Sequence, residues 1–243
     1  MKLNYINTIN SLKGIAIIAI VLFNSDISLK GMSILPGGFV GIDIFLVIIG
    51  FITTITILKE FNRNNNFSLI KFHIDCLKKI YPTLLIVFLF FLPFAWSYLL
   101  TDKFTDFSKS ILYSTIFFSN FYFHLTGLFD GSAAVNFKPF HHTWVISLIF
   151  QFYIVFPIIL LFSLKYFKRY THLIILFLLL ASFYATFLGI NEYPNATYYF
   201  LTTRFWEFLS GSIVGIVFFQ NKKKLKNKLF NTIILTLSIC ILS

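Results

Sequence analysis

A few polar residues that can take part in acid–base or ion-pair chemistry stand at the ends of long apolar stretches of the sequence. His141 and His142 precede Trp144 at the start of one stretch, and Arg204 and Glu207 stand three residues apart in another. A histidine accepts a proton near neutral pH, so His142 is a candidate general base. The simpler alternatives are an interfacial histidine beside an aromatic residue, and a structural ion pair between the arginine and the glutamate.

Three further polar residues stand in the first two apolar stretches. Lys13 and Asn24 are eleven positions apart, which is about 16 Å along a helix. Lys13 either has a function within the membrane or simply extends its side chain to the lipid headgroups. Asp43 begins the second stretch, where it either has a partner or stays hydrated near the surface. Three glycines just before it permit close approach between helices: Gly37, Gly38 and Gly41.

The composition requires a membrane. Of the 243 residues, 58% are hydrophobic, only 12% are charged and 34 are phenylalanine. Too few polar side chains remain to cover a soluble globule, so soluble enzymes, nucleic-acid-binding modules and disordered chains are excluded. The net charge of +11 comes from short basic runs between apolar stretches, which are typical of loops flanking membrane helices and do not indicate a nucleic-acid partner. No acid or cysteine stands at ligand spacing beside the two histidines, so no metal is predicted.

The apolar stretches predict an all-α, polytopic transmembrane bundle that forms one domain over residues 1–243. About 20 residues cross the hydrocarbon. About seven spans follow, at 9–28, 38–58, 80–100, 143–164, 171–190, 199–219 and 229–243.

The distribution of basic residues predicts the orientation. With the N-terminus inside and 109–123 not crossing, the inner segments hold 14 basic residues and the outer segments hold 4. If 109–123 crossed, the basic runs at 165–170 and 220–228 would lie outside. Retention of basic residues in the cytoplasm therefore favours a re-entrant or interfacial position for 109–123. The candidate polar residues near the outer ends of the spans are then expected to converge in the outer third of the membrane.

Five strings, in order, resemble the acyltransferase family 3 membrane proteins, which include O-antigen and peptidoglycan O-acetyltransferases. They are INSLKGIAIIAIVLFN, PGGFVGIDIFLVIIGF, FHIDCLKKIYPTLLIV, HTWVISLIFQFYIVFP and YYFLTTRFWEFLSG, within residues 8–215. The resemblance implies an enzyme of the bacterial inner membrane with a cytoplasmic N-terminus. Its donor would be a cytoplasmic acyl-CoA, usually acetyl-CoA, and its acceptor a hydroxyl of an extracytoplasmic glycan such as O-antigen, capsule or peptidoglycan.

The resemblance also implies roles for individual residues. The expected catalytic residues are His142, Asp43, Arg204, Glu207 and Asn24, the last of which stands at the position of the family's first-helix histidine. Lys13 and Lys79 are expected to bind acyl-CoA, and Trp144 and Trp206 to bind substrate.

Several positions depart from the family pattern. Asn24 cannot accept and release a proton at neutral pH. The family's Ser-Gly-Phe reads Ile49-Gly50-Phe51, one of two basic positions reads Cys76, and an acidic pair reads Ile149-Phe150. Members of the family have about ten helices, more than the seven predicted here. A catalytically inactive relative that serves as a membrane binding or partner protein is therefore the alternative, and a transporter is less favoured because the polar groups form no path through the bilayer.

Overall fold

The computed structural model describes residues 2–25, 27–29, 32–33, 35–64, 67–136, 138 and 140–220. The described chain is helical apart from one short antiparallel ladder, in which β1 (Ser28–Leu29) pairs with β2 (Met32–Ser33). This confirms the prediction of an all-helical membrane protein. The chain forms two compact units, one of residues 1–62 and 207–243 and one of residues 63–206, which we describe in turn.

The first unit packs its helices through glycines. It contains α1 (Lys2–Asn24), most of α2 (Val40–Asn64) and residues 207–220 of α9 (Leu201–Gln220). A Cβ atom on Gly41 would lie 2.7 Å from the Ala16 carbonyl oxygen, closer than real side chains approach. Gly38 is equally close to α1. The predicted close approach of the first two helices is thus confirmed.

The contact between α2 and α9 uses one glycine from each helix. A Cβ on Gly50 would overlap the Phe208 carbonyl, and a Cβ on Gly211 would overlap the Val47 carbonyl. Small residues that bring backbones together are a common means of helix association in lipid. The Ile-Gly-Phe string at 49–51 therefore has a clear packing function at its glycine.

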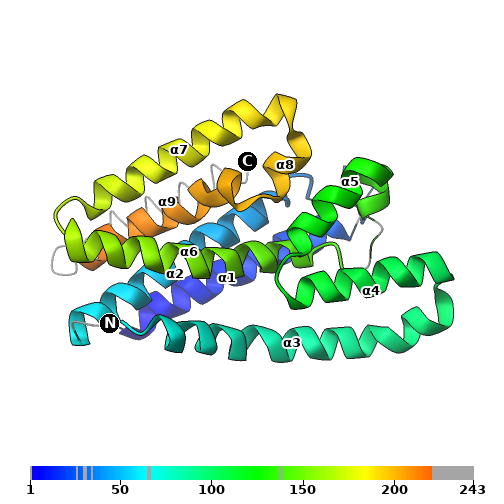
Figure 1. Cartoon of the computed structure of the whole chain (residues 1–243), viewed down its shortest axis with the longest axis horizontal. Coiled ribbons are helices and arrows are strands. Elements are labelled where there is room, and N and C mark those ends of the chain that lie inside the picture. Colours follow the sequence, from blue (N-terminus) through cyan, green and yellow to red (C-terminus); the bar gives the residue numbers. More distant parts are fainter. Residues whose placement is uncertain are drawn as a thin grey trace. The chain divides into compact units, whose positions relative to one another are not determined.

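The second unit begins with a long antiparallel pair, α3 (Leu69–Tyr98) and α4 (Thr101–Thr115) (Figure 1). The Ser68 side chain caps α3 by accepting a hydrogen bond from the Lys71 amide at 3.3 Å. The far end of α4 is tied back to α3, because the Tyr81 hydroxyl donates to the Thr115 carbonyl at 2.6 Å. Helix α3 begins eleven residues before the predicted span at 80–100.

The segment at 109–123, predicted to be re-entrant or interfacial, is not one continuous helix. Helix α4 ends at Thr115, and α5 (Ser119–Asn136) begins four residues later. Between them Phe117 has a φ of 57°, an unusual conformation for a non-glycine residue. Tertiary contacts hold this break: the Phe117 ring stacks on Phe150 at 4.0 Å between centroids, and its carbonyl accepts a hydrogen bond from Gln151 at 3.0 Å.

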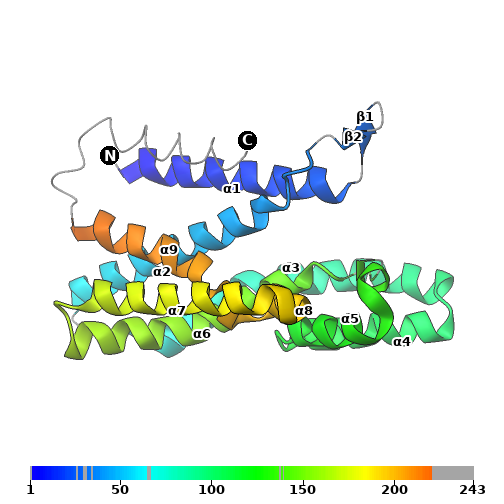
Figure 2. The same cartoon turned by 90° about the horizontal axis from the view of Figure 1, so that it is seen from above.

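The remaining helices of the second unit are α6 (Thr143–Tyr166), α7 (Thr171–Glu192) and the short α8 (Pro194–Tyr199). Figure 2 shows α7 alongside α6. Hydroxyl groups of α7 reach the start of α9: Ser182 donates to the Thr202 carbonyl at 2.6 Å, and Thr186 donates to the Thr203 carbonyl. These bonds fix the turn that carries α8.

Five helices of the described chain are long and apolar enough to cross a membrane. They cover Asn7–Asn24, Val40–Arg63, Leu69–Tyr98, Thr143–Tyr166 and Thr171–Glu192. The predicted span at 199–219 corresponds to α9, which is not among the five and carries Arg204 and Glu207 in its first half. Helices α4 and α5 are also not among them. The predicted span at 229–243 lies outside the described residues.

Candidate active site

Five side chains from three helices meet at the start of α6, and we call them the His–Trp–Arg cluster. His141 comes from the turn just before α6 and Trp144 from the first turn of α6, Tyr198 and Tyr199 come from the end of α8, and Arg204 from the first turn of α9. Phe140, next to His141, contacts the rings of two residues of α3, with centroids 4.9 Å from Phe88 and 6.1 Å from Phe91. Phe140 thus lies beside α3 at a level about 10–15 Å before the end of that helix.

Aromatic rings position Arg204. Its guanidinium carbon lies 4.8 Å from the centroid of Tyr198 and 5.3 Å from the centroid of Trp144. Its Nε donates to the Tyr198 carbonyl at 2.8 Å. Trp144 is fully buried, and its Nε1 has no hydrogen-bond partner among the described residues. A positive charge stacked on aromatic faces is fixed in place and suited to stabilise an anion or a developing oxyanion.

His141 is buried and is bonded to a tyrosine. Its Nε2 and the Tyr199 hydroxyl share a hydrogen bond of 2.7 Å. Burial, and to a smaller extent the neighbouring His142, lowers the pKa of His141 to about 4. His141 is therefore neutral at pH 7, and its bond to Tyr199 fixes the orientation of the ring.

His142 is the more accessible of the two histidines. Its side chain is exposed, and its ring centroid lies 5.2 Å from that of His141. Partial desolvation lowers the pKa of His142, so its imidazole is neutral and able to accept a proton at neutral pH. Of the pair, His142 is the one that an acceptor hydroxyl could reach.

Two side-chain amides, the buried Asn120 and the partly buried Gln151, support the cluster. Asn120 is fully buried, and its Nδ2 donates to the Tyr199 carbonyl at 3.1 Å and to Gln151 Oε1 at 3.3 Å. Gln151 returns a hydrogen bond to Asn120 Oδ1 at 2.9 Å. The pair thus connects the break after α4, the middle of α6 and the end of α8. Sequence analysis missed this function, although Gln151 lies within one of the five family strings.

Two hydroxyl pairs continue this connection toward the start of α6. Ser119 and Ser147 share a hydrogen bond of 2.7 Å, and Ser114 and Thr143 share one of 2.6 Å. All four residues are buried. Polar side chains therefore join α4, α5 and α6 just behind His142.

The structure does not bring Trp206 to the cluster. Its backbone amide donates to Ser182 Oγ at 3.0 Å, and its ring packs on Phe183 of α7 with centroids 5.4 Å apart. Two residues after Arg204, its side chain points toward a different neighbour because successive helical residues are about 100° apart. A shared substrate-binding role with Trp144 is not supported by this placement.

The first unit carries four of the predicted site residues: Lys13, Asn24, Asp43 and Glu207. Asn24 is the last residue of α1, is exposed, and donates from Nδ2 to the Ile20 carbonyl at 2.8 Å. Asp43 is partly buried in the first turn of α2, where the helix dipole favours a carboxylate. Lys13 is partly buried within α1.

Glu207 and Lys79 complete the predicted set. Glu207 is only 3% exposed and follows Arg204 by one turn of α9, as the spacing predicted. Lys79 is exposed near the start of α3. The convergence of these residues with His142 stays a prediction. Within the described ranges, no group of three or more His, Cys, Asp or Glu side chains is placed to hold a metal ion.

Comparison with known proteins identifies the family. Residues 6–243 match the family described as an acyltransferase domain. The chain belongs to this acyltransferase family. The resemblance inferred from the five strings is confirmed, and with the five long apolar helices it makes the chain an integral membrane protein of an enzyme family.

Relatives of this acyltransferase include named O-acetyltransferases. A protein of Haemophilus influenzae called uncharacterized is 35% identical over 212 residues, which cover 82% of this chain and 84% of that protein. The peptidoglycan O-acetyltransferase OatA of Listeria monocytogenes is 27% identical over 225 residues, which cover 90% of this chain and 35% of that protein. A putative O-acetyltransferase of Staphylococcus aureus is 30% identical over 168 residues, 69% of this chain and 27% of that protein. The chain thus spans about a third of the length of these two named relatives. No solved structure matches it.

Proposed function

We propose that this acyltransferase moves an acyl group, most simply acetyl, from acyl-CoA at the cytoplasmic face to a hydroxyl of an envelope glycan outside the cytoplasm. One observation supports the proposal above others: a stacked arginine lies in one cluster with His141, whose ring neighbours that of His142, in a chain that belongs to an acyltransferase family. The names of relatives favour acetyl as the group transferred. O-antigen, capsule and peptidoglycan are the acceptors to be tested.

The proposed reaction needs a base and an oxyanion stabiliser. The His142 imidazole takes the proton of the acceptor hydroxyl while the hydroxyl oxygen attacks the carbonyl carbon of the thioester. The tetrahedral intermediate carries its negative charge close to Arg204. The carbon–sulfur bond then breaks, and the CoA thiolate leaves with the proton from the imidazolium. The products are an ester and free CoA.

Other residues have supporting functions in this proposal. Lys13 and Lys79 would hold the anionic phosphates of CoA at the cytoplasmic face. Glu207, one helical turn after Arg204 on α9, would balance the arginine's charge, and Asp43 is proposed as a further catalytic residue. The protein lies in the inner membrane with its N-terminus in the cytoplasm, as the basic residues favour.

A second candidate function has an observation of its own. Asn24 has no titrating nitrogen where the family has histidine, and its amide is bonded to the Ile20 carbonyl of its own helix. A chain that has lost catalysis could persist as a membrane-embedded binding or partner protein. The two functions predict different products in the cell envelope.

Expression in a strain lacking its own O-acetyltransferases separates them. The envelope is assayed for ester-linked acetate with the unaltered chain, with His142→Ala and with Asn24→His. An enzyme that uses His142 should lose about 10²–10⁴ in rate in the alanine variant. His172→Ala, on an exposed position of α7, is the matched control and should retain activity. Ester formation that survives His142→Ala would exclude His142 as the base, and its absence from all forms would favour the second candidate.

A further inference from the structure

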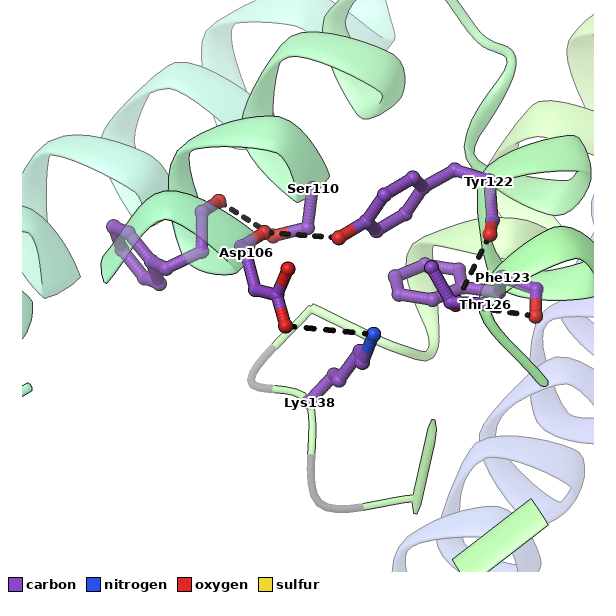
Figure 3. A network of polar contacts seen from close by, with 7 residues as sticks. Asp106, Ser110, Tyr122, Phe123, Thr126 and Lys138 are labelled. Carbon is purple, nitrogen blue, oxygen red and sulfur yellow. Dashed lines mark hydrogen bonds and ion pairs between the residues drawn. The ribbon is translucent and has the colours of Figure 1, made fainter. Parts of the chain in front are cut away.

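The connection that leads into α6 is tethered at Lys138 by a charged and aromatic contact. The Lys138 Nζ lies 3.7 Å from Oδ2 of Asp106 on α4 (Figure 3). It also lies 5.4 Å from the ring centroid of Tyr122 on α5. The Lys138 side chain is only 9% exposed, against 34% for Asp106. The attraction of an ammonium group to an anion and to a ring face is stronger when the group is mostly removed from water than when it is exposed.

The tether is joined directly to the histidine pair through the backbone. The His141 amide donates to the Lys138 carbonyl at 3.0 Å, and the Trp144 amide donates to the His141 carbonyl at 3.2 Å. Lys138 is thus the first residue of the turn from which α6 starts. A displacement of Lys138 would move the ring positions of both His141 and His142.

The tether is rigid because its partners are themselves bonded. The Tyr122 hydroxyl donates to the Asp106 carbonyl at 3.3 Å, and Tyr122 stacks on Tyr113 with centroids 5.0 Å apart. On the other side of the turn, Phe140 packs 5.1 Å from Phe107 of α4. The histidine turn is therefore held by an apolar contact on one side and by an ion pair on the other.

We propose that the Asp106–Lys138 ion pair, seated on the Tyr122 ring, is a positioning device that places the His141–His142 turn for acyl transfer. The acyl-transfer part of this inference rests on the proposed function. The positioning part rests on geometry alone. Contacts from α4 and α5 to Lys138 and Phe140 set the position of the turn. A general base displaced by about 1 Å can lose 10²-fold in rate.

The first experiment measures position without activity. His142→Cys is made in a Cys76→Ser/Cys240→Ser background, and its rate of reaction with a maleimide is measured in membranes. Lys138→Gln and Asp106→Asn should each change this rate at least about twofold, and the exchange Asp106→Lys/Lys138→Asp should restore it, as coupled residues do. Asp102→Asn and Lys103→Gln, exposed positions one turn earlier on α4, are the matched controls and should leave the rate unchanged.

A second variant keeps the test valid if Lys138→Gln does not accumulate in membranes. Tyr122→Leu removes the ring beneath the ammonium without removing a charge and should alter the same rate. Tyr122→Phe keeps the ring and should alter it less. Labelling rates that do not respond to these changes, or that the exchange fails to restore, overturn the inference.

The second experiment measures catalysis. It uses the unaltered chain if that chain forms esters, and the Asn24→His variant if only that variant does. Lys138→Gln should lower kcat by about 10–100-fold with little change in KM for acyl-CoA, and the charge exchange should recover it. A labelling response without transfer in any background would mean that the positioning holds and the proposed function fails. Transfer that is insensitive to Lys138 and Asp106 would mean the reverse.

Discussion

The two units of the molecule hold their helices together by different means. In the first, glycines bring backbones into contact, as at Gly50 and Gly211. In the second, polar side chains cross between helices, as in the Asn120–Gln151 pair and the His141–Tyr199 bond. Lipid is as apolar as the helices, so association depends on close packing and on interhelical hydrogen bonds. The first unit relies on close packing at glycines, and the second unit adds hydrogen bonds between helices.

The difference also separates the candidate catalytic residues. His141 and Arg204 are oriented by residues of other helices, which is what a preorganised site requires. Asn24 bonds to its own helix, four residues back. The second unit therefore has the features of an organised site, and the first unit carries the main departure from the family pattern.

The largest expected effect comes from restoring a titrating group at the end of α1. If the first-helix position and not His142 supplies the general base, Asn24→His should raise the rate of ester formation by about 10²–10⁴, the usual value of a general base. The measurement is the amount of ester-linked acetate that can be released from the envelope glycan. Asn24→Gln, which also lacks a titrating nitrogen, is the control and should give no gain. Efficient transfer by the unaltered chain would contradict the importance assigned to this position.

The next effect tests glycine packing in the first unit. Gly50→Ala should lower the free energy of unfolding by about 1–3 kcal/mol or more, because the new methyl group would overlap the Phe208 carbonyl. Gly14→Ala, where nothing lies within 4 Å of the new Cβ, should be neutral or stabilising. Unfolding in mild detergent measures both. Equal stability of the two variants would show that α2 and α9 are not packed as described.

Polar packing in the second unit can be tested with matched apolar replacements. Asn120→Leu should lower the free energy of unfolding by about 1–2 kcal/mol, because it leaves Gln151 and the Tyr199 carbonyl without this donor. The double replacement Asn120→Leu/Gln151→Leu should recover part of the loss, since both amides are then removed. Strictly additive losses would argue against a coupled pair.

The smallest effect is a pH dependence of the second unit. Folding lowers the pKa of His141 from 6.5 to about 4, so the unfolded state binds more protons between these values. Stability should be complete above pH 6.5 and fall as the pH drops toward 4, by about 1 kcal/mol at pH 5.5. His141→Asn should remove this dependence, whereas His172→Asn should retain it. A pH-independent unfolding free energy in this range would contradict the buried, neutral state of His141.

The sequence alone determined the class of the protein and its family. Apolar stretches of about 20 residues in a chain with few charges permit only a helical membrane protein, because helices satisfy their own backbone in lipid. Five ordered strings indicated the acyltransferase family. The glycines at 38 and 41 predicted close helix approach, since the absence of a side chain is a local property.

Tertiary structure decided which residues meet. His141 and Tyr199 are 58 positions apart, and no spacing rule relates residues on different helices. The break at Phe117 depends on contacts from α6, which no local feature of the run at 109–123 specifies. Trp206 packs on α7 although Arg204, two positions earlier, contacts Trp144, because helix rotation separates their faces. Periodicity fixes which residues share a face of one helix, and only packing between helices decides what that face contacts.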